Sequence, residues 1–195
     1  MLNKILTSAF VLFFAFSSSL LASNTLNLNA EKSSIKWEGK KVVGRHFGKI
    51  NPKNGIITIE DNKITAGNVN VDMTSIVVED LEDKATNAKL TGHLKSDDFF
   101  STEKNTTSTF KLKSIKENAG KYTVTGDLTI KGNTNSVSFT PEVMIKDNMV
   151  TLKGKLIVDR TKFDIKYGSG SFFDNLGDKA IDNDFTLDLN LQFAK

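Results

Sequence analysis

The sequence predicts an all-β protein whose eight antiparallel strands close into a barrel, with one or two short helices. Apolar and polar residues alternate with period two along most of the chain, and turn sequences separate the alternating runs at short, even spacing. Two longer stretches interrupt the pattern. Residues 185–193 alternate most regularly, with five apolar residues on one face and four polar residues on the other. Such strands bury one face and expose the other.

Each alternating run is expected to form one strand. The eight expected strands are 34–43, 54–60, 63–73, 108–117, 121–130, 135–145, 149–159 and 184–193. Turn residues occur between them at 61–63, 118–120, 131–133 and 147–148. Because short turns connect antiparallel neighbours and a long open edge promotes aggregation, a sheet of this size should close or fold into two layers.

The interruptions predict the helical and irregular parts. Segment 81–101 contains helix-forming residues, and Gly92 is expected to end a first helix. Ser96 or Asp97 is expected to cap a second short helix that holds two phenylalanines. Segment 160–183 is rich in Gly and Asp, so we expect a long, partly helical crossing before the last strand.

Three residues within the expected strands are unusual there. Pro141 interrupts the strand 135–145, and proline is tolerated in a sheet at an edge or a bulge. Gly126 and Gly154 fall on inward-facing rows. They either allow the barrel to bend and close, or leave volume for a ligand.

The first 22 residues have the layout of a secretory signal peptide. Lys4 precedes an apolar run over 5–16, and small residues lead to Ala22. Cleavage after Ala22 would leave residues 23–195 as a single exported domain. The alternative is an uncleaved membrane anchor, for which the apolar segment is barely long enough. Since the chain has no cysteine, the stability of this domain must come from its hydrophobic core.

The composition argues against several classes of function. A net charge of +3, from 26 Lys and Arg against 23 Asp and Glu, is too small for an ordinary nucleic-acid-binding protein. One Trp and two Tyr cannot supply the aromatic girdles of an outer-membrane barrel. With two histidines, no cysteine and no catalytic sequence motif, we expect neither a metal site nor catalytic residues.

Two acidic clusters leave other chemistry open. The Asp97-Asp98 pair and residues 182–184 could serve acid–base catalysis or calcium binding. The second cluster lacks the Gly and the terminal Glu of an EF-hand loop, and the first could equally cap a helix.

Seven short segments occur in the same order as those of a known family. They are IKW (35–37), GRHFG (44–48), VDMTSI (71–76), HLKSDDFF (93–100), TF (109–110), YTVTGDLTIKG (122–132) and DRTKFDIKYG (159–168). Together they resemble the YceI-like family of periplasmic polyisoprenoid- and lipid-binding proteins. Many members of that family have glycine where this chain has Asp164.

The resemblance implies an extended, lipocalin-like barrel whose tunnel holds a long amphiphilic lipid. The implied ligands are a polyisoprenoid, such as a polyprenyl quinone or polyprenyl phosphate, or a fatty-acid derivative. The protein would be a periplasmic or secreted carrier that sequesters its ligand, and it would need no cofactor other than the bound lipid. Transient contact with a membrane and a homodimer are both compatible with this role.

On this hypothesis, inward-facing residues line the tunnel. The expected lining residues are Trp37, Val71, Phe110, Val124, Leu128, Phe139, Leu152, Leu156 and Phe185, with Phe99, Phe100 and Phe163 closing the ends. The candidates for contact with the lipid head group are His46, Arg160 and Tyr167. For Arg160 the alternative is a structural ion pair with Asp97 or Asp98.

Two other functions remain open. A lipid-modifying enzyme would need His46 and His93 beside Asp97 or Asp98 at the mouth of the tunnel. A structural or stress-protective envelope protein would have a barrel filled with side chains.

Overall fold

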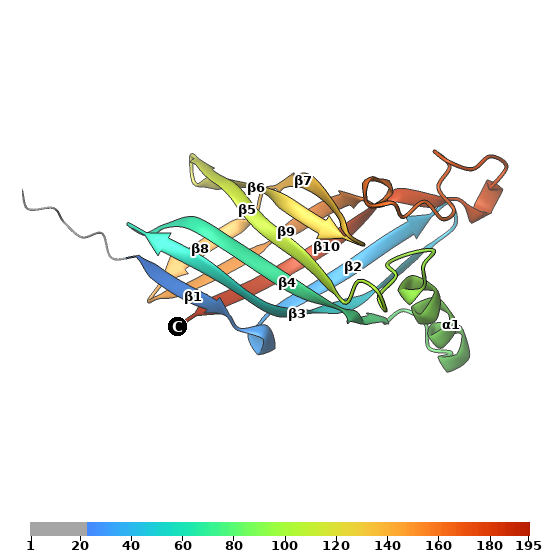
Figure 1. Cartoon of the computed structure of the whole chain (residues 1–195), viewed down its shortest axis with the longest axis horizontal. Helices are drawn as coiled ribbons and strands as arrows, with labels where there is room; N and C mark the ends of the chain where they lie inside the picture. The colour runs from blue at the N-terminus through green and yellow to red at the C-terminus, as the bar shows by residue number, and fades with distance from the viewer. Residues whose placement is uncertain (1–22) are drawn as a thin grey trace, which may run out of the picture.

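A single sheet of ten strands curves into an elongated barrel in the computed structural model, which describes residues 23–195 (Figure 1). The predicted all-β barrel is confirmed. The predicted signal peptide, residues 1–22, lies outside the described residues.

The strands follow one another mainly as antiparallel hairpins. Their bounds are β1 (Asn24–Leu28), β2 (Ser34–Lys41), β3 (Arg45–Glu60), β4 (Lys63–Val78), β5 (Thr107–Asn118), β6 (Lys121–Ile130), β7 (Asn133–Phe139), β8 (Glu142–Lys146), β9 (Met149–Asp159) and β10 (Ile181–Ala194). Hydrogen bonds connect them in the order β7-β6-β5-β4-β3-β1-β10-β9-β8, and β2 pairs with β3 and β10.

The predicted number of eight strands is wrong, but the ring has eight strand positions. β1 and β2 both pair with β3 and β10, so they occupy one position in succession. The 3₁₀ turn Ala30–Lys32 separates them. The expected strand 135–145 is likewise divided at Pro141 into β7, which pairs with β6, and β8, which pairs with β9.

The seam between β7 and β9 depends on a close contact between Pro141 and Gly154. A Cβ atom on Gly154 would lie 2.9 Å from the Pro141 Cα atom, so glycine lets the proline pack directly on β9. A Cβ atom on Gly126 would collide with the ring of Phe110. The closure interpretation therefore holds for Gly154, and neither glycine leaves empty volume at its own position.

The alternating rows point into the barrel as expected. The row of β10 that begins at Phe185 pairs with an equally apolar row of β9, so that Leu187 lies opposite Leu156 and Leu191 opposite Leu152. Ile157, an apolar residue on the outward row of β9, is exposed to solvent. The core therefore surrounds the barrel axis.

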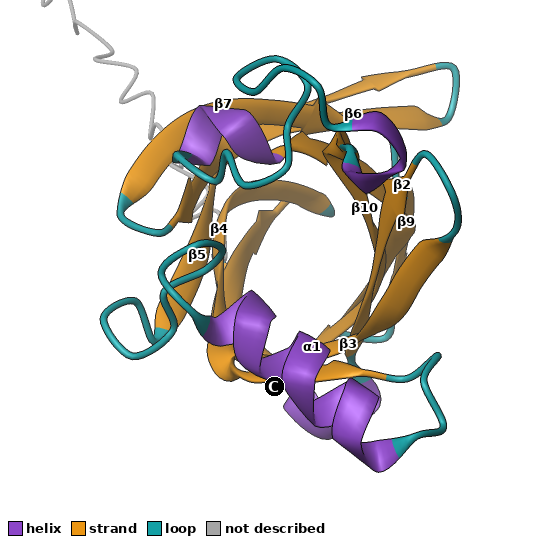
Figure 2. Cartoon of the chain, turned by 90° about the vertical axis from the view of Figure 1, so that its right-hand side faces the viewer, coloured by secondary structure: helices purple, strands orange, loops and turns teal. Residues whose placement is uncertain are grey.

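The helix α1 (Lys84–Lys95) lies at the rim of one end of the barrel, which Figure 2 views along the barrel axis. Asp83 caps it by accepting a hydrogen bond from the Thr86 N–H at 2.8 Å. The predicted break at Gly92 is wrong, because α1 continues to Lys95, and the predicted second helix is a series of turns over 97–100. None of the helices in residues 23–195 is long and apolar enough to cross a membrane.

The crossing 160–183 covers the same end and is partly helical, as predicted. It contains the 3₁₀ turns Arg160–Phe163 and Gly177–Lys179. Asp164 ends the first turn in the left-handed conformation, with φ 59° and ψ 34°. Aspartate tolerates this region better than most residues, and its carboxylate pairs with Lys166 at 2.8 Å. Asp164 can therefore replace glycine there.

Two glycine substitutions test the closure at Pro141. Gly154→Ala should lower the free energy of unfolding by about 1–3 kcal/mol, because its Cβ atom would press on the proline backbone. Gly92→Ala is the matched control: no atom lies within 4 Å of its Cβ position in α1, so it should raise stability by about 0.5–1 kcal/mol. Urea unfolding of both variants measures the difference. Equal effects would contradict the proposed role of Gly154.

Candidate functional site

The barrel encloses two adjacent apolar cavities along its axis. The one nearer α1, named the outer chamber, has a volume of about 180 Å³, and the deeper one, named the inner chamber, has a volume of about 100 Å³. Five residues line both chambers, namely Ile35, Val71, Ser108, Leu128 and Leu187. The two chambers therefore lie next to each other and together form an elongated lumen. Well-packed protein interiors rarely contain voids of this size.

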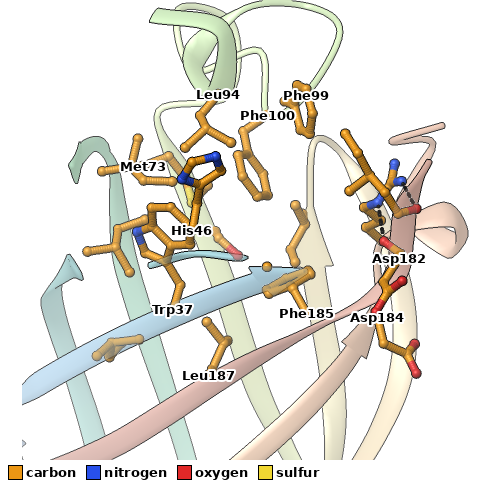
Figure 3. A pocket seen from close by; sticks show the side chains of 18 of the residues that line it. Trp37, His46, Met73, Leu94, Phe99, Phe100, Asp182, Asp184, Phe185 and Leu187 are labelled. Atoms are coloured by element: carbon orange, nitrogen blue, oxygen red, sulfur yellow. Dashed lines mark hydrogen bonds between the residues drawn. The ribbon is translucent and has the colours of Figure 1, made fainter. Parts of the chain in front are cut away.

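Residues from β2, β3, β4, α1 and β10 form most of the outer chamber (Figure 3). Its remaining lining residues are Trp37, Gly39, Lys40, Lys41, His46, Ile50, Met73, Ile76, Leu90, Leu94, Phe99, Phe100, Ile130, Arg160, Ile181, Asp182, Asp184 and Phe185. The charged residues of this set all lie at the ends of β2 and β10 or at the start of the crossing. The polar groups are therefore concentrated at the open end, which we call the mouth.

The inner chamber has an almost entirely apolar wall. Its remaining lining residues are Ile57, Ile64, Gly67, Asn68, Val69, Phe110, Leu112, Ile115, Val124, Phe139, Val150, Leu152, Leu156, Leu189, Leu191 and Phe193. The Asn68 amide oxygen accepts a hydrogen bond from the Ile56 N–H at 3.3 Å, and the Ser108 hydroxyl donates to the Thr129 carbonyl at 2.7 Å. These polar groups are thus already bonded within the protein.

Most of the predicted lining residues do face the lumen. Eleven of the twelve line one chamber or both, and Phe163 is the exception, because it is buried outside them. Among the head-group candidates, His46 and Arg160 line the outer chamber, but Tyr167 lies outside it. The predictions that Phe163 closes the tunnel and that Tyr167 faces it are therefore not supported by the geometry.

Sequence reasoning missed several lining residues that had a readable signal. Leu187, Leu189, Leu191 and Phe193 share the inward row of β10 with Phe185, so the period of two could have identified them. On α1, Leu90 and Leu94 both line the outer chamber. Their spacing of four residues places them on one helical face, which was a further signal.

The Trp37 ring, which lines the outer chamber, packs closely against β4. A Cβ atom on Gly48 would collide with the Val77 carbonyl and lie 3.0 Å from the Trp37 ring. The indole N–H donates to that same carbonyl at 3.1 Å. The ring thus presents its apolar surface to the lumen while its polar atom is bonded within the wall.

Arg160 organises the crossing around the mouth. It is buried and donates four hydrogen bonds to backbone carbonyls, those of Asp182, Ile165, Tyr167 and Ile181, at 2.8 to 2.9 Å. Burial lowers the pKa of this guanidinium, and the nearby charges of Asp159 and Asp182 offset part of the decrease. Arg160 therefore fixes the start of β10 against the crossing.

The predicted ion pair of Arg160 with Asp97 or Asp98 is wrong. Asp97 pairs with Lys104 at 2.6 Å, and Asp98 pairs with His93 at 3.1 Å. A hydrogen bond from Lys104 and another from Ser101 hold the pKa of Asp97 below its usual value. This acidic pair belongs to the turns after α1.

His46 projects into the outer chamber (Figure 3) and bonds to the carboxylate of Asp80. Its Nδ1 atom lies 2.8 Å from Asp80 Oδ2, and the Phe47 N–H donates to Asp80 Oδ1 at 3.0 Å. Burial alone would raise the pKa of Asp80, but the hydrogen bonds from Phe47 and His46 outweigh it and lower the pKa. Asp80 thus holds the imidazole in a defined orientation.

The second histidine lies in an aromatic cluster on the rim. The His93 ring packs edge-on against Tyr167 and Phe99, with centroids 4.6 Å and 4.9 Å away. Lys131 adds a second link, because its ammonium donates to the backbone carbonyls of Asp97 and Asp164. These contacts join α1 and its following turns to the crossing.

The four residues of the enzyme hypothesis do not form one site. His46 is bonded to Asp80, His93 to Asp98, and Asp97 to Lys104. Residues 23–195 contain no group of three histidine or acidic side chains placed to hold a metal ion. Of the contacts that the enzyme hypothesis requires, His93 makes one with Asp98, whereas His46 bonds to Asp80 instead.

Comparisons with known proteins identify relatives of this chain. The family model described as the YceI-like domain matches residues 26–193. A UPF0312 protein of Photorhabdus laumondii is 33% identical over 98 residues, which are 50% of this chain and 48% of that protein. The chain thus spans about half the length of the curated relatives that it matches first.

Two solved structures are similar in fold. The crystal structure of Burkholderia cenocepacia BcnA superposes with a TM-score of 0.61 at 22% identity, covering 85% of this chain and 98% of that one. A polyisoprenoid binding domain from Saccharophagus degradans superposes with a TM-score of 0.59 at 14% identity, covering 89% and 98%. At these identities the likeness establishes the shared barrel fold.

The lowered pKa of Asp80 predicts that this carboxylate contributes to stability in a pH-dependent way. The pKa of Asp80 is lowered from its usual value in the folded protein, so its contribution to stability is complete above the pKa of the unfolded chain and is lost as pH falls through the folded value. Asp80→Asn should lower the free energy of unfolding by about 1–3 kcal/mol near neutral pH. Urea unfolding from about pH 6 to about pH 3 should show this gap shrinking. A gap that stays constant would mean that the carboxylate charge is unimportant.

Proposed function

The chain belongs to the YceI-like family, and on that premise we propose that it binds a long amphiphilic lipid, with the apolar chain inside the barrel and the head group at the mouth. The polyisoprenoid-binding relative in fold from Saccharophagus degradans supports a polyisoprenoid as the ligand class. A fatty-acid derivative is the alternative ligand. The binding role is that of an exported carrier or sequestering protein, which acts in the periplasm.

The observation that carries this proposal is the elongated apolar lumen. Its two chambers follow one another along β10, whose residues 181 to 187 line the outer chamber and 187 to 193 the inner one. From residue 181 to residue 193 the strand spans roughly 40 Å, at about 3.3 Å per step. A cavity of this shape suits a linear chain better than a compact molecule.

The energetics agree with a ligand held mainly by its chain. Each buried CH₂ group contributes about 0.8 kcal/mol. About ten such groups would supply the roughly 8 kcal/mol of a micromolar complex before ordering costs are subtracted. Since the polar groups of the inner chamber are bonded within the wall, selection among lipids falls to the mouth.

The other two functions fit the geometry less well. A barrel that acts purely as a structural envelope protein was expected to be packed with side chains, whereas this lumen contains chambers of about 180 and about 100 Å³. A lipid-modifying enzyme would need its histidines and acids together, and here they bond to separate partners.

Mass spectrometry of the purified protein tests the proposal directly. Protein prepared from its host without detergent should carry a bound lipid, visible as an added mass in native spectra and identifiable after organic extraction. Delipidated protein should bind a fluorescent acyl probe. Protein that carries no lipid and also fails to bind acyl and polyprenyl probes would contradict the proposal.

A tryptophan in the inner chamber should block binding. Leu156 is buried and lines this chamber, so Leu156→Trp should lower the affinity for the acyl probe at least about tenfold while costing about 1–3 kcal/mol of stability through overpacking. Ile157→Trp is the matched control, because the neighbouring side chain points outward. Titration of both variants with the probe measures the effect. Unchanged affinity in Leu156→Trp would place the ligand elsewhere.

The mouth should affect selectivity more than affinity. His46 lines the outer chamber near Lys40 and Lys41, so this end offers donors to an anionic head group. His46→Ala should weaken binding of a polyprenyl phosphate by about tenfold and that of the corresponding alcohol by less than about twofold. Competition titrations with the two lipids measure the ratio. An equal loss for both would assign His46 a structural role.

A further inference from the structure

Exposed apolar side chains gather around the mouth of the barrel. Of the nine large apolar side chains exposed among residues 23–195, four belong to two neighbouring loops beside the mouth. These four, which we call the mouth patch, are Val42, Val43, Phe172 and Phe173, with exposed fractions of 62%, 61%, 49% and 50%. None of them lines either chamber. The lipid site alone therefore does not explain them.

The two loops of the mouth patch lie side by side. Val42 and Val43 form the tip of the hairpin between β2 and β3, and the Val42 N–H donates to the carbonyl of Ala180, in the crossing, at 3.2 Å. Both loops stand at the end of the barrel that Figure 2 faces. Because Lys40 and Lys41, directly before Val42, line the outer chamber, the patch is continuous with the rim.

Hydrogen bonds hold the phenylalanine loop in this exposed arrangement. The N–H groups of Phe172 and Phe173 both donate to the Ser169 carbonyl at 3.0 Å. The Ser169 hydroxyl is buried and lies 2.6 Å from the Asn183 amide oxygen, and the Asn183 amide nitrogen donates to Ser171 at 2.8 Å. The loop thus has a defined structure that directs two aromatic rings into solvent.

Cations flank the valine half of the patch. Lys40, Lys41 and Arg45 flank the two valines, whereas Glu38, which pairs with Lys40 and Arg45, is the one acid in residues 38–45. On the other loop, the Lys166 ammonium lies 5.3 Å from the Phe172 ring centroid. The acids of this loop balance its lysines, so the positive excess comes from the hairpin.

We propose that the mouth of the barrel docks on an anionic lipid bilayer. The four apolar side chains enter the interface, and the hairpin cations contact lipid phosphates. This inference rests on the proposed function, because a docked mouth lets a lipid chain pass between bilayer and lumen without crossing water. Each CH₂ group exposed on the way would otherwise cost about 0.8 kcal/mol.

A bilayer fits this surface better than a protein partner does. Two projecting loop tips with apolar ends and basic flanks match the layered chemistry of a membrane surface, which is apolar inside and negatively charged outside. The patch also adjoins the opening of an apolar lumen, where lipid must enter and leave.

Vesicle binding with matched variants tests the docking. The full described domain, residues 23–195, is sedimented with vesicles of phosphatidylglycerol and phosphatidylcholine, and with phosphatidylcholine alone. The wild type should bind the anionic vesicles and release them at high salt, since screening weakens the cation contacts. Val42→Asp combined with Val43→Asp should reduce vesicle binding at least about tenfold.

The control places the same charges on the barrel wall. Met144 and Ile157 are 65% and 64% exposed and line neither chamber. Met144→Asp combined with Ile157→Asp should therefore bind vesicles like the wild type. An equal loss in both double variants, or wild-type binding by the Val42 and Val43 variant, would overturn the docking proposal.

A soluble acyl probe separates this inference from the proposed function. Without vesicles, the Val42→Asp and Val43→Asp variant should bind the probe with wild-type affinity, because these residues lie outside the chambers. With vesicles as the lipid source, its loading rate should fall about tenfold, in proportion to docking. A wild type that binds the probe but not the anionic vesicles would overturn the docking alone. A wild type that fails to bind the probe would overturn the proposed function.

Discussion

The two-residue period of the strands, imposed on a sheet that curves into a barrel, is the constraint on which the rest of this structure depends. It directs every second side chain into the lumen, and a ring of eight strand positions is just wide enough to be filled or to hold one ligand. Side-chain size then decides between these outcomes. At Gly126 the missing Cβ atom lets the Phe110 ring lie over the neighbouring strand. Because the Phe110 ring lies against the wall, it takes up less of the lumen, so the small residue Gly126 creates space indirectly.

The regular strands could be predicted because their pattern is local. β10 and β9 are long and alternate apolar with polar residues almost throughout, and their expected positions were nearly correct. β1 was missed because five residues carry too little periodicity, and its pairing partners lie far away in sequence. The helix continued through Gly92 because an exposed helical glycine lowers stability only modestly. Local signals therefore predicted the presence of a strand or helix better than the residues at which it begins and ends.

The sequence predicted the site residues that lie on the inward-facing rows of the strands. It did not predict the positions that depend on tertiary hydrogen bonds. Trp37 and Leu156 face the lumen because each lies on the inward-facing row of its strand. Phe163 and Tyr167 do not, because the 3₁₀ turn after Asp159 and the left-handed Asp164 end the strand's alternation. Arg160 was expected to meet a carboxylate or a head group. Its planar fork of donors matches several carbonyls at once, and only the folded crossing brings those carbonyls together.

In a binding site of this kind, the lumen determines the affinity for the ligand and the rim determines how fast the ligand exchanges. Each further CH₂ group of a chain raises its affinity about fourfold and slows its escape correspondingly. From β8 through β10 and β3 to β7, ladders of hydrogen bonds join neighbouring strands, so these strands cannot part cheaply to release a ligand. The rim is different, because α1 and the crossing meet there through individual side chains, such as His93 on Tyr167 and Lys131 on two carbonyls. Phe99 links these two layers, since it packs on His93 and also lines the outer chamber. Because the Phe99 ring also lies 5.5 Å from the Tyr167 ring, between centroids, the same side chain belongs to the chamber wall and to the contact that joins the turns after α1 to the crossing.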